Sequence, residues 1–331
     1  MTADRQRLVE EAQRIIAAGS KSFRFASQIF DLTTRERSWL LYSWCRACDD
    51  VTDGQTLGHD AHMPGDPAAR LGFLTEMTDA ALAGRTTGIA PFDALAAVAA
   101  ETNIPADLPH DHLAGFARDA AGWSPATAEE LLSYCYQVAG AVGVMMAQVM
   151  GVAPTEHDTM DRAADLGIAF QLANIARDIV EDARVGRCYL PADWLAAEGL
   201  AGADLADPRH RPALARVTRR LADLADVYRR SSKVGAARLP LRSRWAVLSA
   251  AGIYGEVATR AVALGPRAWD RRISISKAEK FALVIEAFGE ALMPAPKLNR
   301  EGLWTRPRAP AAVLPANPSA LRPAATTRSR S

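Results

Sequence analysis

Two short segments of the sequence carry acidic side chains at the spacing of one helical turn. In the first, Asp49 and Asp53 stand four positions apart with Asp50 beside them, so on a helix Asp49 and Asp53 point from the same face. Like charges at this spacing destabilise an isolated helix. Mg²⁺ would compensate them, because it commonly binds one or two carboxylates together with substrate phosphates. Taken alone, so short a motif favours a solvated helix end.

The second acidic segment extends the pattern into a longer stripe. Gln171, Asn174, Asp178 and Asp182 follow one another at intervals of three, four and four residues, which places their oxygen-bearing side chains on one helix face. The other faces are apolar, as in a buried helix, and carry Leu172, Ile175, Ile179 and Val180. Carboxylates on a buried helix are costly unless they are paired or bind a metal.

Pairing within the chain is the alternative to metal binding, with Arg177 and Arg184 as the available partners. We favour the metal, because amides and carboxylates line up on one face at ligand spacing. Two such faces predict one site, in which Mg²⁺ ions would bridge a diphosphate, neutralise its charge and improve it as a leaving group. The candidate cationic donors to such a substrate are Lys21, Arg46, Arg177, Arg187 and Arg271.

The elements that must position these residues are predicted to be helices. Good helix formers dominate the sequence, alternating β-branched runs are rare, and Thr33–Glu36 and Thr127–Glu130 match the capping-box pattern. The patterns predict helices near residues 4–18, 34–53, 67–84, 91–101, 110–122, 127–151, 157–184, 208–233, 241–264 and 276–292.

Composition is that of a globular protein, with 49% hydrophobic and 23% charged residues among 331. Lys+Arg number 39 and Asp+Glu 38, a formal net charge of +1, so the basic surplus of a nucleic-acid-binding protein is missing. We predict one all-α domain over residues 1–303. Beyond Glu301 the chain has no acids and many prolines. Residues 304–331 are therefore predicted to form a disordered tail.

Cysteine usage and apolar runs argue against several other classes. Cys45-x-x-Cys48 could bind zinc, but it lies in a helical pattern without a second ligand pair, so packing is favoured. The apolar segment Val138–Ala153 has 16 residues, fewer than the roughly 20 that span a membrane, and predicts a buried core helix. Met1–Gln13 is charged and lacks a signal core. We expect a cytoplasmic protein, with peripheral membrane contact left open.

Five segments in order resemble the squalene/phytoene synthase family, and most of all its bacterial phytoene-forming members. They are Gly19–Phe23, Tyr42–Asp53, Tyr134–Gly140, Gln171–Asp182 and Gly186–Pro191. Each segment alone is weak evidence, but the ordered combination, running from about residue 8 to about residue 305, is specific. The resemblance implies the isoprenoid-synthase all-α fold, a helical bundle around a central cavity.

The resemblance also implies roles for individual residues. Asp49, Asp53, Asp178 and Asp182 would be the catalytic carboxylates that hold Mg²⁺ or Mn²⁺, more than one ion per site. Asn174 would join them as a ligand, supported by Gln171. The positions that match contacts to diphosphate oxygens are Ser22, Arg46, Arg177, Tyr254 and Arg271. Phe23 matches an aromatic near the reacting carbons, and the lining of the prenyl tunnel matches Tyr134, Val138, Ala139, Val142 and Gly143.

Two residue patterns agree with these implied roles. Arg187 and Tyr189 follow the second acidic stripe, where the chain could form a flap that closes over the diphosphate and excludes water. The small residues Ala139, Gly140 and Gly143 cluster in an apolar helix. They serve either close helix packing or space for a long hydrocarbon chain.

The activity implied by the resemblance joins two geranylgeranyl diphosphates head to head. A cyclopropyl diphosphate forms first and is converted to phytoene with release of diphosphate, in carotenoid biosynthesis. One alternative is a squalene- or dehydrosqualene-type synthase that uses farnesyl diphosphate. The other is a non-catalytic helical scaffold whose acidic faces are solvated. Expected partners are the isoprenoid diphosphate substrate and neighbouring carotenoid-pathway enzymes; the residues do not decide whether ATP is required.

Overall fold

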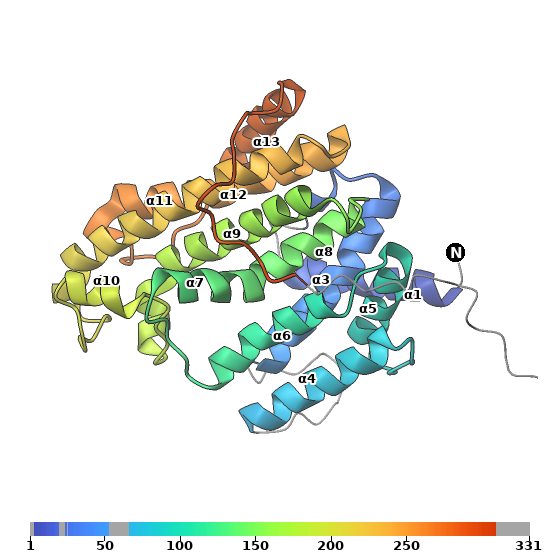
Figure 1. The fold of residues 1–331 in the computed structure, drawn as a ribbon, viewed down its shortest axis with the longest axis horizontal. Coiled ribbons are helices and arrows are strands. Elements are labelled where there is room, and N and C mark those ends of the chain that lie inside the picture. The colour runs from blue at the N-terminus through green and yellow to red at the C-terminus, as the bar shows by residue number, and fades with distance from the viewer. Residues whose placement is uncertain (1–2, 20–23, 25, 53–65, 309–331) are drawn as a thin grey trace, which may run out of the picture.

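The computed structural model describes residues 3–19, 24, 26–52 and 66–308, and across these ranges the chain forms helices and no strand (Figure 1). The predicted all-α class is confirmed. The helices are α1 (Ala3–Gly19), α3 (Leu32–Thr52), α4 (Pro67–Leu82), α5 (Ala90–Thr102), α6 (Asp107–Ala120), α7 (Ala128–Cys135), the π-helix η1 (Tyr136–Gly140), α8 (Ala141–Val149), α9 (His157–Arg184), α10 (Ala192–Ala197), the 3₁₀-helix η2 (Pro208–His210), α11 (Arg211–Ala236), α12 (Leu241–Leu264), the 3₁₀-helix η3 (Gly265–Arg267) and α13 (Lys277–Leu292).

Helix α3 is capped by a different residue from the one predicted. It begins at Leu32, and Asp31 accepts hydrogen bonds from the backbone N–H of Thr34 at 3.0 Å and from its hydroxyl at 2.7 Å. Thr33 lies inside the helix, so the expected capping box there is wrong. At Thr127 the predicted N-cap is confirmed, because its hydroxyl accepts from the N–H of Glu130 at 3.3 Å. The Glu130 carboxylate accepts from the N–H of Ala126 at 2.7 Å rather than from that of Thr127, so the reciprocal half of the capping box is shifted by one residue.

The predicted helix over residues 127–151 is interrupted by a π-helical turn. Residues Tyr136–Gly140 form η1 between α7 and α8. Such turns are uncommon and frequently lie at functional sites. Here the turn holds Val138 and Ala139, two of the residues expected to line a prenyl tunnel.

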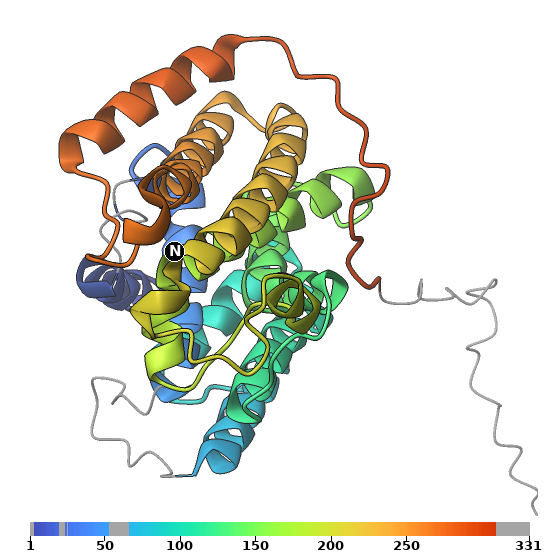
Figure 2. The same cartoon turned by 90° about the vertical axis from the view of Figure 1, so that its left-hand side faces the viewer.

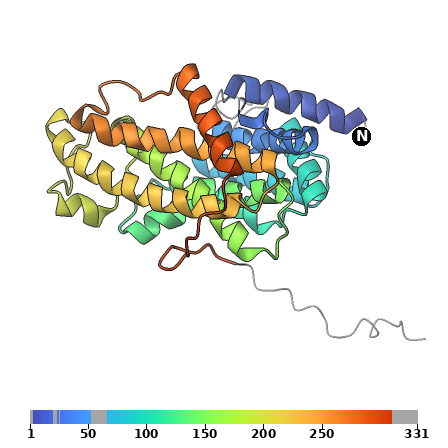
Figure 3. The same cartoon turned by 90° about the horizontal axis from the view of Figure 1, so that it is seen from above.

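Helix α9 is the central element, and α8, α11 and α12 all pack against it (Figures 1 and 2). Its apolar side chains enter the main core, where Leu172, Ile175 and Val180 are almost completely buried. Burial on this scale is the dominant favourable term in folding. Helices α3, α5 and α1 pack together on one side of the bundle, and α13 lies outermost, across α12 (Figure 3).

Small residues bring η1 and α8 close to α9. A Cβ added at Gly143 would lie 2.4 Å from the carbonyl oxygen of Ala163, and one at Gly167 would lie 2.2 Å from that of Ala139. Neither contact is possible for a real Cβ, so both glycines are required by helix packing. At Gly143 the packing interpretation of the small residues therefore holds.

The segment from Pro294 to Arg308, here called the C-terminal strap, returns from α13 across the bundle (Figure 2). The guanidinium of Arg300 donates to the fully buried carboxylate of Asp165 at 2.6 and 2.8 Å. Arg306 and Arg308 approach Asp161 at 2.9 and 2.6 Å. Because Asp161 and Asp165 are buried on α9, these ion pairs satisfy charges that would otherwise be costly.

Trp304 completes the contacts of the strap. Its backbone N–H donates to the hydroxyl of Tyr228 at 3.1 Å, and its ring lies 5.3 Å from that of Tyr136 in η1. The composition of the sequence predicted that a disordered tail begins at residue 304. In the structure, residues as far as Arg308 still contact the helical domain. Residues 309–331 lie outside the described residues, and their disorder stays a prediction.

One helix in the described chain, Leu241–Arg267, is long and apolar enough to cross a membrane by length and composition, with 39% of the tested window buried. It contains α12, which packs against α9, α11 and α13 as a core helix does. The apolar segment Val138–Ala153 lies in the core as predicted, with Val144 and Met145 almost completely inaccessible, but its helix ends at Val149 and includes the π-turn of η1.

Removing residues 306–331 should destabilise the protein, because it deletes Arg306 and Arg308 and leaves buried Asp161 with Arg300 at 4.0 Å as its remaining partner. We expect a loss on the order of 3 kcal/mol in the free energy of unfolding, as when one member of a buried ion pair is removed. Thermal unfolding followed by circular dichroism measures it. The control is removal of residues 309–331 alone, which should melt like the full chain; equal melting of the two truncations would contradict the role of the strap.

Candidate active site

An apolar cavity of about 350 Å³ lies inside the bundle. Four of the five residues expected to form a prenyl tunnel line it: Val138, Ala139, Val142 and Gly143. The fifth, Tyr134, is buried outside that lining. Ligand cavities are mostly apolar with a few polar groups, and this cavity has that composition.

The cavity has a polar end and an apolar end. On α3 its lining runs from Ser38 to Asp49, and on α12 from Ala246 to Tyr254. The eight-residue step from Ala246 to Tyr254 corresponds to about 12 Å along a helix. Asp49 and Tyr254 therefore mark the polar end. Most of the remaining lining is apolar and includes Phe30, Met146 and Met150, although Thr159, Arg162 and Ser232 also belong to it.

The four polar residues predicted to form a stripe on α9 do lie on one partly exposed face of that helix. Gln171, Asn174, Asp178 and Asp182 are each half-buried, whereas the apolar residues between them are buried. Asn174 donates its side-chain N–H to Gln171 at 3.5 Å. Phe170, one residue before the stripe, lines the cavity. The stripe therefore begins where the cavity wall ends.

Arginines accompany both acidic clusters. Arg177 donates to Asp178 at 2.8 and 2.5 Å, so part of the ion-pair alternative to metal binding is present. On α3, Arg46 approaches Asp50 at 2.6 Å. Arg272 approaches Glu181 at 2.9 Å and Asp178 at 3.7 Å. At this position the donor expected from the sequence was Arg271, which precedes Arg272 and is exposed. The sequence alone does not show which of these two adjacent arginines contacts α9.

Two tyrosines connect the two acidic clusters electrostatically. Burial raises the pKa of Tyr42 to about 12; the charge of Arg46 opposes this rise, and Asp49 and Tyr254 add to it. Burial also raises the pKa of Tyr254, and the charge of Arg177 opposes that rise. The charge of Arg177 on α9 therefore acts on Tyr254, and the charge of Asp49 on α3 acts on Tyr42. Asp49, Tyr42 and Tyr254 all belong to the lining of the cavity.

Asp119 of α6 is a site residue that the sequence did not reveal. Its carboxylate accepts hydrogen bonds from the hydroxyl of Tyr134 at 3.0 and 3.1 Å and from that of Tyr189 at 2.9 Å. The two tyrosine rings stack with their centroids 5.0 Å apart. Tyr189 therefore ties the segment after α9, the expected flap, to Asp119 of α6 and Tyr134 of α7. No spacing pattern marks Asp119, because its partners are distant in sequence.

Asp182 is surrounded by like charges. Burial raises the pKa of its carboxyl to about 6, as do Asp178, Glu181 and Asp119, while Arg187 opposes the rise. Such a set of carboxylates repels itself in the ionised state. A divalent cation with a preference for oxygen ligands would relieve this repulsion, so the donor chemistry fits Mg²⁺ or Mn²⁺.

The described part of the chain contains no group of three or more His, Cys, Asp or Glu side chains placed to hold a metal. Four predicted residues, Asp53, Ser22, Phe23 and Lys21, lie outside the described residues. Burial also raises the pKa of Cys45 and Cys48. Raised pKa values disfavour the thiolate form that binds zinc, which agrees with the packing interpretation of this pair.

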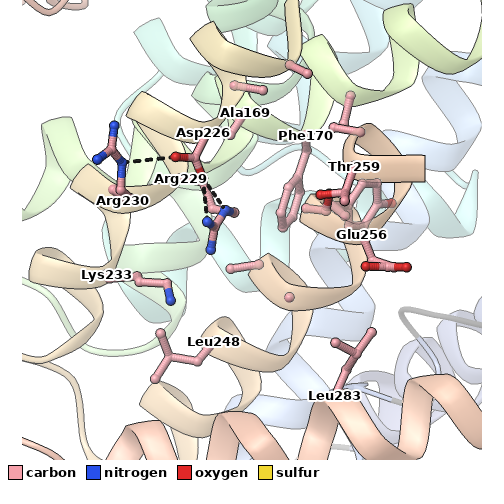
Figure 4. Close-up of a pocket in the computed structure, with 18 of the residues that line it drawn as sticks. Ala169, Phe170, Asp226, Arg229, Arg230, Lys233, Leu248, Glu256, Thr259 and Leu283 are labelled. Carbon is pink, nitrogen blue, oxygen red and sulfur yellow. Dashed lines mark hydrogen bonds and ion pairs between the residues drawn. The ribbon is translucent and has the colours of Figure 1, made fainter. Parts of the chain in front are cut away.

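A second hollow of about 710 Å³ lies between α9, α11, α12 and α13 (Figure 4). It is lined by charged side chains, but its arginines are paired: Arg230 approaches Asp226 at 3.0 Å, and Arg229 contacts the same carboxylate. Phe170 and Tyr254, whose rings stack 4.0 Å apart, line both this groove and the cavity.

Comparison with known proteins adds a second kind of evidence. The squalene/phytoene synthase family model matches residues 16–279. The 15-cis-phytoene synthase of Pantoea ananas is 46% identical over 305 residues, covering 91% of this chain and 98% of the relative. That of Enterobacter agglomerans is 48% identical over 296 residues, covering 87% and 99%. The chain belongs to the squalene/phytoene synthase family.

Solved structures agree with this membership. A dehydrosqualene synthase in complex with ligand superposes with a TM-score of 0.77 at 26% identity, covering 86% of this chain and 97% of that one. A squalene synthase from Alicyclobacillus acidocaldarius gives a TM-score of 0.70 at 22% identity, covering 81% and 97%, which is a likeness of fold alone. The expected isoprenoid-synthase fold is confirmed.

In this member of the squalene/phytoene synthase family, Asp182→Asn should stabilise the metal-free protein at pH 7.5. A carboxyl with a raised folded-state pKa loses its contribution to stability as pH rises through about 6. Removing that charge should therefore add about 2 kcal/mol at pH 7.5 and nothing below pH about 4. Melting temperatures in EDTA at both pH values measure this. A less stable Asp182→Asn protein at pH 7.5 would contradict the electrostatic account.

Proposed function

We propose that this protein is a phytoene synthase, which joins two geranylgeranyl diphosphates head to head and releases both diphosphates. The proposal is supported by the lining of the cavity, which is mostly apolar and includes Asp49 and Tyr254, and by the acidic stripe of α9, which begins next to Phe170 of the same lining. A prenyl diphosphate likewise joins an apolar chain to an anionic end. Identities of 46% and 48% to the two phytoene synthases, over nearly their full lengths, support this reaction over others of the family.

In the proposed reaction the C1–O bond of the first substrate breaks and its electron pair leaves with diphosphate. The double bond of the second substrate attacks the allylic cation, and loss of a proton closes the cyclopropyl diphosphate. A second ionisation, rearrangement and proton loss give phytoene. Released diphosphate is the candidate base for the last proton, because the site offers no evident side chain for this task.

The residues of the chain contribute position and charge. Arg177, Arg272 and Arg46 supply donors beside the acidic clusters, and charge-assisted hydrogen bonds of this kind are the strong ones. Bound Mg²⁺ or Mn²⁺ would neutralise diphosphate charge and so improve the leaving group. Asp49, Asp178 and Asp182 would hold the ions, with Asn174 and Asp53. The apolar walls keep water away from the cations.

Farnesyl diphosphate is the substrate of the alternative function, a squalene- or dehydrosqualene-type synthase. The dehydrosqualene synthase is 26% identical to this chain, well below the values for the two phytoene synthases. The longer substrate is therefore the better proposal. We further propose a cytoplasmic enzyme that meets a membrane surface and neighbouring carotenoid-pathway enzymes when its hydrocarbon product leaves. We assign no ATP requirement.

Product analysis tests the proposed reaction. The purified protein with Mg²⁺ is given geranylgeranyl diphosphate or farnesyl diphosphate separately, and extracted hydrocarbons are identified by mass spectrometry. We expect phytoene from the first substrate and little product from the second, and a loss of about 100-fold or more in turnover for Asp178→Asn. Glu10→Ala, at an exposed acid on α1, is the control. A C30 product alone would select the alternative, and absence of diphosphate release would select the scaffold.

Ala139→Phe tests where the hydrocarbon lies. Because Ala139 lines the cavity, the larger ring should lower kcat/KM for geranylgeranyl diphosphate much more than for the shorter farnesyl diphosphate. Gly143→Ala is the matched comparison: its Cβ would meet the Ala163 carbonyl at 2.4 Å. That change should cost about 1–3 kcal/mol of stability and affect both substrates alike. If Ala139→Phe also affected both substrates equally, the tunnel assignment would be wrong.

A further inference from the structure

Helix α13 exposes a stripe of large apolar side chains. Phe281, Ile285, Phe288 and Leu292 are 58%, 57%, 40% and 61% exposed, and Met293 follows directly with 62%. The first four recur at intervals of four, three and four residues, so they lie on one helix face. Single exposed apolar residues are ordinary, whereas a continuous row marks a surface that meets something apolar. We call these five residues the α13 stripe.

A neighbouring face of α13 fixes the helix to the body of the protein. Val284, Ala287 and Ala291 are buried there. The indole N–H of Trp245 on α12 donates to the carbonyl of Val284 at 2.8 Å. Because α13 is held by this face, the α13 stripe points outward, on the outermost helix of the bundle (Figures 2 and 3).

The same buried face connects α13 to the apolar end of the cavity. Val284 packs in one cluster with Ile29, Phe30 and Ala246. Phe30 and Ala246 also line the cavity, far from Asp49. A single layer of side chains therefore separates the end of the cavity that would hold hydrocarbon from the helix that carries the α13 stripe.

Charges around the α13 stripe are arranged asymmetrically. Lys277 is exposed at its first turn, Lys297 is exposed beyond its last, and Arg244 donates to the carbonyl of Met293 at 2.8 Å. The acids Glu286 and Glu290 turn instead toward α11, where they line the polar groove and Glu290 pairs with Lys233 at 2.7 Å. Basic residues at both ends of an apolar row complement anionic lipid headgroups.

We propose that the α13 stripe docks on the surface of an anionic lipid bilayer, with the helix lying in the plane of the interface. The hydrocarbon product then passes from the apolar end of the cavity into the membrane without crossing water. The docking surface follows from exposure and charge alone, whereas the exit route rests on the proposed phytoene synthase function.

Co-sedimentation of the full-length protein with vesicles tests the proposal. Vesicles of phosphatidylcholine with one-third phosphatidylglycerol should carry the wild type into the pellet. The double variant Ile285→Glu/Leu292→Glu should bind at least tenfold more weakly, because it places charge in the centre of the stripe. Val185→Glu, which adds the same charge at an apolar residue 70% exposed after α9, should bind like the wild type.

Both variants replace exposed residues, and unchanged melting temperatures establish that they fold; Phe281→Ser/Leu292→Ser provides a milder second test of the stripe. A wild type that stays in the supernatant, or a stripe variant that binds as well as the wild type, would overturn the proposal. So would a wild-type dimer that the stripe variant converts to a monomer without vesicles, since the stripe would then belong to a second copy. Binding needs no substrate, so it is decided independently of the product analysis.

Discussion

The rest of the structure depends on one electrostatic constraint: α9 carries a row of carboxylates while most of its circumference is buried. A buried ionised carboxylate raises the free energy of the folded state unless a cationic group pairs with it. Toward its start α9 receives that charge from the C-terminal strap, through Arg300 at Asp165 and Arg306 at Asp161. Toward its end Arg177 and Arg272 pair with Asp178, while burial and then the neighbouring carboxylates raise the pKa of Asp182. The two ends of this helix thus differ: the acids near its start are paired with arginines of the strap, and we propose that the acids near its end bind a divalent cation.

Close packing around α9 shapes the site as much as charge does. Gly143 and Gly167 let η1 and α8 approach α9 to within backbone contact. The π-turn of η1 then presents Val138 and Ala139 to the cavity beside Phe170 of α9. Under the proposed function, a cavity enclosed by these helices would hold a flexible prenyl chain in place and keep its reacting end near Asp49 and Tyr254. The position of the substrate would then depend on backbone contacts that a single methyl group at Gly143 or Gly167 would disturb.

Helix positions and the acidic stripe were predictable, because periodicity and capping are local properties of sequence. Features formed by distant segments were not. Asp119 accepts hydrogen bonds from Tyr134 and Tyr189, and the residues next to Asp119 in the sequence do not indicate these contacts. Arg272, rather than Arg271, faces α9 because of the loop geometry after η3. Arg306 and Arg308 lie in an acid-free, proline-containing segment that resembles a tail, and their partner Asp161 is 145 residues or more upstream.

We propose that the ends of α3 and α9 form one diphosphate site at the mouth of one apolar cavity. A crystal structure of the protein with Mg²⁺ and a non-hydrolysable thiodiphosphate analogue of geranylgeranyl diphosphate tests this most directly. We expect diphosphate density between Asp49 and Asp178, with the hydrocarbon running past Ala139 toward Met146. Diphosphate bound in the groove between α11 and α13, or a prenyl chain outside the cavity, would contradict it.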